Sequence, residues 1–133
     1  MDLIRWTPDL ELGIEEIDRQ HREVVDLINR LYACHLAGER RDVLGAIIEE
    51  LERQTERHFA DEERWMADNG IAGAAEHAAE HRSMLDDLHR YCDACVLGDG
   101  DPKVILGYME HGFLRHIDDT DRRLVAGTAP TAA

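Results

Sequence analysis

Aromatic residues make up only 5% of the 133 residues, which argues against a large all-β core. No apolar run approaches the ~18 residues that a membrane-spanning helix needs. The first residues include early acidic side chains and lack the apolar stretch of a secretory signal peptide. We therefore expect a cytoplasmic protein without membrane insertion.

Basic residues are also scarce, because 15 Lys and Arg stand against 29 Asp and Glu and give a formal net charge of −14. Binding to nucleic acid or to an anionic membrane surface requires a basic surface, so we expect neither function. Most of the acidic excess is interpreted as solvated helix surface. The negative field also favours binding of cations.

Cysteine is limited to Cys34, Cys92 and Cys95. An odd count without a signal peptide indicates reduced thiols rather than a disulfide framework. Cys92 and Cys95 form a CxxC pair, but they fall late in a predicted helix and not after a strand, as a thioredoxin-like motif requires. We interpret both as small core residues, with a redox pair as the alternative.

Period-2 alternation of apolar residues is absent, so strands are not expected. Helical periodicity instead covers four segments, 15–37, 41–69, 74–97 and 101–125. Their lengths and short connections predict an all-α, up-down-up-down four-helix bundle. The bundle follows an irregular N-terminal lead, 1–14, and precedes a tail, 127–133, that is expected to be disordered. Residues 1–133 are thus expected to form a single domain.

The helix boundaries are marked by residues with known local preferences. Gly38 and Gly70 are expected to stop the first two helices. Asp101 and Pro102 supply a cap and a first-turn proline for the fourth. The inward stripe of the second helix is predicted to consist of Leu44, Ile47, Leu51, Thr55, His58, Glu62 and Trp65.

Histidines and a glutamate interrupt the apolar stripes of all four predicted helices. These residues are His21, His58, Glu62, His77, His81 and His116. Burying an unpaired carboxylate costs several kcal/mol, and an unpaired polar ring costs about 1–3 kcal/mol. Spacings of four place His58 with Glu62, and His77 with His81, on one helix face. Asp121 lies five residues after His116, about 140° around the helix and one turn further along, and can reach inward if the helix end is tightened or turned. Such convergence predicts a metal site.

Seven ligands are too many for one tetrahedral zinc, but they suit two six-coordinate metal ions that share bridging carboxylates. With an additional oxygen bridge, one coordination position stays open for a small ligand. The segment from His77 to His81 also fits the H-x-x-E-H pattern of a zinc peptidase class, with Glu80 as base. That alternative leaves the histidines of the other helices unexplained.

Four segments carry a resemblance to a known family: GIEEIDRQH (13–21), HFADEERWM (58–66), HAAEH (77–81) and HIDDTDRRL (116–124). Taken together, they resemble the hemerythrins, and specifically the single-domain bacteriohemerythrins. The similarity extends over about residues 6–124, nearly the whole chain. It implies a four-helix bundle with a non-haem di-iron centre.

The resemblance also implies a role for each ligand. One iron would be held by His77, His81 and His116, and the other by His21 and His58. Glu62 and Asp121 would bridge the two ions together with an oxo or hydroxo group. The open position on the second iron would bind dioxygen reversibly, for storage, delivery or sensing. The protein is accordingly not expected to be an enzyme.

The residues expected to line the ligand pocket are Val24, Phe59, Met84, Phe113 and Ile117. Hemerythrins usually carry a tryptophan at the position of Gly112 and an aromatic residue at the position of Met84. These departures predict a looser pocket that admits water or larger ligands. Two alternatives therefore stay open: a di-iron enzyme that reduces nitric oxide or peroxide, and an iron-buffering module.

Overall fold

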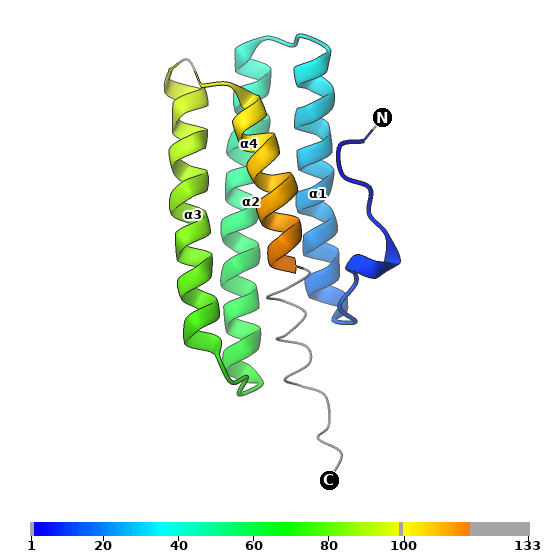
Figure 1. Ribbon diagram of the computed structural model, residues 1–133, viewed down its shortest axis with the longest axis vertical. Helices are drawn as coiled ribbons and strands as arrows, with labels where there is room; N and C mark the ends of the chain where they lie inside the picture. Colours follow the sequence, from blue (N-terminus) through cyan, green and yellow to red (C-terminus); the bar gives the residue numbers. More distant parts are fainter. Residues whose placement is uncertain (1, 99, 118–133) are drawn as a thin grey trace.

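The computed structural model describes residues 2–98 and 100–117. Its elements are η1 (Pro8–Leu10), α1 (Glu15–Leu36), α2 (Arg41–Asp68), α3 (Ala74–Leu97), α4 (Pro102–Tyr108) and the π-helical η2 (Met109–Phe113). Within these ranges there is no strand, and each long helix runs beside the next in alternating direction (Figure 1). Contacts of α4 with both α1 and α3 close the bundle. The predicted all-α, four-helix architecture is confirmed.

Several expectations concern residues outside the described ranges. They are the bridging role of Asp121, the end of the fourth helix at about residue 125, and the tail 127–133. Among the residues that are described, none of the helices combines the length and the apolar character needed to cross a bilayer.

The first two helices end at glycines, as the sequence predicts. Gly38 has φ +71° and Gly70 has φ +60°. This left-handed backbone conformation is strained for residues with a Cβ atom, so glycine ends a helix there at little cost. At the start of α4, the Asp101 side chain accepts a hydrogen bond from the Lys103 amide at 2.9 Å. That contact is the predicted N-cap.

The register of α2 differs from the predicted stripe. Ile48 and Met66 are buried in the core, whereas Ile47 and Trp65 are only half-buried. Both pairs are sequence neighbours, and neighbours on a helix point about 100° apart. Because α2 packs against α1 on one side and α3 on the other, its inward face is set by two partners at once. Ile47 and Trp65 still pack against the core, but the fully buried positions of α2 are Ile48 and Met66.

The fourth helix is not the uninterrupted α-helix that the sequence predicts, because Met109–Phe113 forms a π-helical turn. Ile105, Met109 and Phe113 are nevertheless all buried. In a regular α-helix, residues eight apart drift by about 80° around the axis. The wider π turn reduces this drift and keeps the buried side chains on the inward face up to His116.

The N-terminal lead is fastened to α1 by two sets of hydrogen bonds. The Asn29 side chain exchanges hydrogen bonds with the backbone amide and carbonyl of Ile4, both at 2.8 Å. The buried Asp18 carboxylate accepts from the backbone amides of Leu12 at 2.8 Å and Gly13 at 3.0 Å. These contacts fix the chain where it enters the bundle.

Candidate metal centre

Six of the seven predicted ligand residues converge inside the bundle. They lie on every helix of the bundle: His21 on α1, His58 and Glu62 on α2, His77 and His81 on α3, and His116 in the segment after η2. All six are buried. The seventh, Asp121, is outside the described residues. The stripes that the sequence places on separate helices thus meet in one volume.

One oxygen of Glu62 faces the histidines of α3. Glu62 Oε1 lies 2.5 Å from Nε2 of His77 and 3.2 Å from Nε2 of His81. The Nε2 atom of His81 is in turn 3.0 Å from Nε2 of His116. Three imidazole nitrogens and one carboxylate oxygen therefore point at a common volume, which we call the three-histidine half.

The other oxygen of Glu62 faces the first two helices. Glu62 Oε2 lies 3.1 Å from Nε2 of His58 and 3.7 Å from Nε2 of His21. The two imidazole rings meet edge to face, with centroids 4.3 Å apart. This group, the two-histidine half, shares only Glu62 with the first. The carboxylate stands between the two groups.

The charge of Glu62 is set by opposing effects. Burial raises the pKa of its carboxyl group, but the four imidazoles around it, His21, His58, His77 and His81, lower that pKa, and the net pKa is well below its ordinary value. Glu62 is therefore held as a carboxylate in spite of its complete burial. An ionised oxygen on each side is what a bridging ligand requires.

The donor set fits metal ions better than it fits a hydrogen-bonded core. In each half, the nitrogen and oxygen atoms lie within 4.8 Å of one another. Among the described residues, Glu62 Oε2 makes no well-directed hydrogen bond although it is buried. Buried carboxylates normally have such partners or bind a metal. Imidazole nitrogens combined with carboxylate oxygens suit iron, among other transition metals.

Three side chains, to which the sequence analysis gave no such role, hold the outer nitrogens of ligand histidines. The Nδ1 atoms donate as follows: His58 to Gln20 Oε1 at 2.9 Å, His81 to Glu63 Oε2 at 3.2 Å, and His116 to Glu80 Oε1 at 3.2 Å. Each of the three acceptors is a sequence neighbour of a ligand. That adjacency is the only signal that could have suggested them.

Four of the five predicted pocket residues, Val24, Phe59, Phe113 and Ile117, are buried in the core. Met84 is half-buried and packs at the edge of the same core. The aromatic side chains lie against the histidines, since the Phe113 ring is 5.8 Å from that of His21. The surroundings of both halves are thus mainly apolar.

The zinc-peptidase alternative does not fit this arrangement. Glu80, its proposed base, is hydrogen-bonded to His116 instead of facing the space between His77 and His81. The two histidines of the motif share their ligand space with Glu62 and His116. The H-x-x-E-H pattern is part of a larger cluster.

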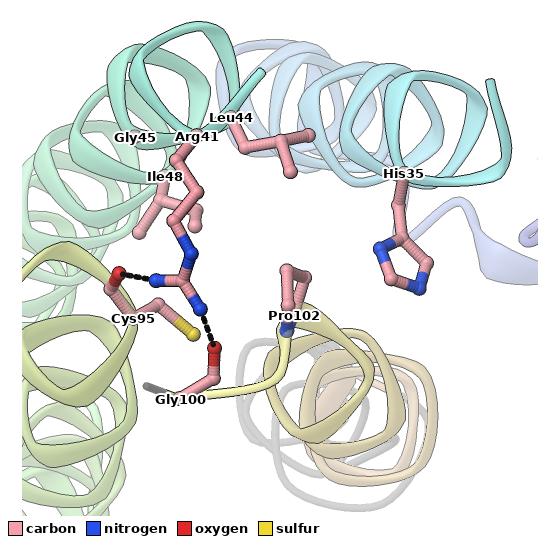
Figure 2. Close-up of a pocket in the computed structure, with 8 residues that line it drawn as sticks. All are labelled: His35, Arg41, Leu44, Gly45, Ile48, Cys95, Gly100 and Pro102. Atoms are coloured by element: carbon pink, nitrogen blue, oxygen red, sulfur yellow. Dashed lines mark hydrogen bonds between the residues drawn. The ribbon is translucent and has the colours of Figure 1, made fainter. Parts of the chain in front are cut away.

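A separate cavity of about 180 Å³ lies at the other end of the bundle, where α2 begins and α3 ends. Figure 2 shows Arg41, His35 and Pro102 around it, with the Cys95 sulfur nearby. None of the six converging ligand residues lines this cavity. It is therefore distinct from the candidate metal centre.

Fold and site together define a four-helix bundle with a buried cluster of metal-binding residues. A family model described as the hemerythrin HHE cation binding domain matches residues 12–126. The chain belongs to the hemerythrin family.

Similar proteins agree with this assignment. The chain is 34% identical over 91 residues to a bacteriohemerythrin of Stenotrophomonas maltophilia, covering 68% of this chain and 59% of that relative. It is 30% identical over 116 residues to a bacteriohemerythrin of Pseudomonas aeruginosa, covering 87% and 75%. A bacteriohemerythrin of Clostridium acetobutylicum is 27% identical over 125 residues, covering 90% and 97%. The crystal structure of a hemerythrin mutant has the same fold, with a TM-score of 0.88, 22% identity and coverage of 96% and 98%.

Proposed function

We propose that this chain holds two iron ions and binds dioxygen reversibly, for storage, delivery or sensing. The observation that carries the proposal is the placement of Glu62, whose two oxygens face separate groups of imidazoles. One ion would be held by the three-histidine half and the other by the two-histidine half. Glu62 would bridge them, with Asp121 and an oxo or hydroxo group as further bridges.

The pair of irons would supply reversible two-electron exchange with dioxygen. The protein's part is to bind the ions, to orient the imidazoles and to exclude water. The two-histidine half has one imidazole fewer, so it is the half with room for a small ligand. Phe113 lies beside it, with ring centroids 5.8 Å from His21 and 6.3 Å from His58. This apolar wall disfavours water and charged species more than it disfavours dioxygen.

Similarity to the bacteriohemerythrins supports the same function. The cytoplasmic location stays a prediction. The free thiols of all three cysteines agree with it.

The second candidate is an enzyme that reduces nitric oxide or peroxide. It is favoured by Gly112, where the atoms nearest to an added Cβ would be those of the Tyr108 ring, at 3.9 Å. Gly112 and Met84 are both half-buried, and neither supplies the aromatic side chain that hemerythrins usually carry at these positions. Turnover would need an external electron donor, whereas reversible binding needs none.

Optical spectroscopy on the iron-loaded protein tests both candidates. The protein is reduced without air and then exposed to dioxygen. Reversible binding predicts an absorption band that appears with dioxygen and disappears when the dioxygen is removed. Immediate and permanent oxidation would contradict it. Sustained consumption of nitric oxide or peroxide in the presence of a reductant would favour the enzyme. Iron analysis should give two ions per chain.

A further inference from the structure

The outer hydrogen bonds of the ligand histidines follow the order of the helices. Gln20 of α1 holds His58 of α2. Glu63 of α2 holds His81 of α3, and Glu80 of α3 holds His116 of the last helical segment. Each helix therefore orients a ligand on the helix that follows it, and the assembled bundle is needed to aim the imidazoles.

Among the described residues, the outer acceptor of His58 differs in charge from those of His81 and His116. In the three-histidine half, His81 and His116 each donate to a carboxylate. In the two-histidine half, His58 donates to the neutral amide of Gln20. A carboxylate at the Nδ1 proton makes the opposite ring nitrogen a stronger metal ligand, in addition to fixing the tautomer and the ring plane.

Asp61 explains why position 20 carries an amide. The Gln20 Nε2 group donates to Asp61 Oδ2 at 2.7 Å, which leaves Oε1 pointing at His58. A glutamate at position 20 would bring a second negative charge against Asp61. The local structure therefore favours a neutral acceptor in the two-histidine half.

From this arrangement we propose that Glu63 and Glu80 are positioning residues whose negative charges make the three-histidine half the tighter of the two metal sites. Gln20 orients His58 without adding charge, so the two-histidine half binds its ion more weakly. The inference rests on the proposed two-metal centre and adds to it which of the two sites binds its ion more tightly. The more weakly held ion is then the one in the half that has room for a small ligand.

The exposure of the two glutamates makes the proposal testable without damage to the core. The side chains of Glu63 and Glu80 are 39% and 44% exposed, whereas the ligand residues are buried. Glu63→Gln and Glu80→Gln preserve the shape of the side chain and a hydrogen-bond acceptor, and remove only the charge. Glu49→Gln makes the same charge change at an exposed position of α2 about 20 Å along the helix from Glu63, and is the matched control.

The experiment is a titration of the metal-free full chain with Co²⁺ in competition with a chelator of known affinity. The wild-type protein is expected to bind two ions in two resolved steps. Glu63→Gln and Glu80→Gln should each weaken the tighter step by roughly tenfold or more, in line with outer-sphere substitutions at other metal sites. Gln20→Met should weaken only the second step. Glu63→Asp, which restores the charge, should recover part of the lost affinity.

The outcomes separate the inference from the function on which it rests. If Glu63→Gln and Glu80→Gln bind as Glu49→Gln does, or weaken only the second step, the charge asymmetry is overturned while the two-metal centre stands. If the wild-type chain binds fewer than two ions, the two-metal centre is contradicted and the inference with it. Thermal unfolding of each metal-free variant shows whether the fold is intact.

Discussion

Phe59 of α2 lies flat against His81 of α3, with ring centroids 3.9 Å apart and planes inclined by only 4°. The same histidine donates its outer nitrogen to Glu63 and directs its inner nitrogen at Glu62. The ring is thus fixed in plane by hydrogen bonds and out of plane by Phe59. A ligand held in both ways loses little entropy on binding a metal ion.

Phe59→Leu removes this stacking and should weaken metal retention in the three-histidine half as well as the fold. We expect a loss of about 1–2 kcal/mol in unfolding free energy, from smaller apolar burial and the lost ring contact. Phe113→Leu is the control, because Phe113 is equally buried but meets His21 and His58 edge-on. Urea unfolding and chelator competition measure both effects. Equal metal retention in the two variants would mean that the stacking has no part in ligand orientation.

His89 of α3 should make the stability of the bundle depend on pH. Its Nδ1 lies 2.5 Å from Glu52 Oε2 and its Nε2 lies 2.8 Å from Glu56 Oε1, both on α2. The hydrogen bond from Nδ1 to Glu52 and the ion-pair contact of Nε2 with Glu56 both favour the protonated ring. The hydrogen bond to Glu52 raises the pKa of His89, burial lowers it, and the charges of Glu52, Glu56 and Asp93 raise it further, so that the net pKa is above its ordinary value.

A raised folded-state pKa fixes the direction of the effect. The stabilisation is complete below the unfolded-state value of about 6.5 and is lost as the pH rises through the higher folded-state value. The difference in unfolding free energy between wild type and His89→Gln should therefore shrink from pH 6 to pH 9. His111→Gln, at an exposed position, serves as control. A difference that stays constant or grows with pH would contradict the protonated bridge between α2 and α3.

Arg41 joins the start of α2 to the end of α3, as Figure 2 shows in part. Its Nη1 donates to the carbonyls of Cys95 at 3.0 Å and Gly98 at 2.6 Å, and its Nη2 donates to that of Gly100 at 3.3 Å. Positive charge at the carboxyl end of a helix is favourable. Arg41→Met should lower the unfolding free energy by about 1–3 kcal/mol.

The matched substitution Arg41→Lys keeps the charge and loses the forked geometry, so we expect an intermediate stability. Metal binding should be unchanged in both variants, since Arg41 contacts the end of α3 and the ligand histidines lie near its start. Urea unfolding with parallel Co²⁺ titration checks this. A loss of metal affinity in Arg41→Met would show that the two ends of the bundle are coupled.

Cys92 should be unreactive in the folded protein. It is 1% exposed, and burial raises the pKa of its thiol to about 12. Burial also raises the pKa of Cys95. Because the thiolate is the reactive form, a thiol reagent at pH 8 should label only the half-buried Cys34 before unfolding, and all three cysteines in urea. Rapid labelling of Cys92 and Cys95, or a disulfide between them in air, would favour the redox alternative.

The sequence was sufficient to bring six of the seven candidate ligands to a common site, and the seventh, Asp121, lies outside the described residues. A buried imidazole or carboxylate without a partner is costly, so His58 with Glu62 and His77 with His81, each four residues apart on an apolar stripe, already indicate convergence. Their function as iron ligands stays a prediction. Gln20, Glu63 and Glu80 could not be found in the same way. Each is next to a ligand, points about 100° away from it, and meets a histidine of another helix.

Hydrophobic periodicity in the sequence determined that this chain forms four helices, and glycines determined that the first two end at Gly38 and Gly70. Both signals are local, so the sequence alone carries them. Three other features depend on the assembled bundle. They are the burial of Ile48 in place of Ile47, the π turn at Met109–Phe113, and the hydrogen-bond partner of each ligand histidine. Each helix there has two neighbours, and its rotation must satisfy both packing surfaces at once. No single periodic stripe contains that information.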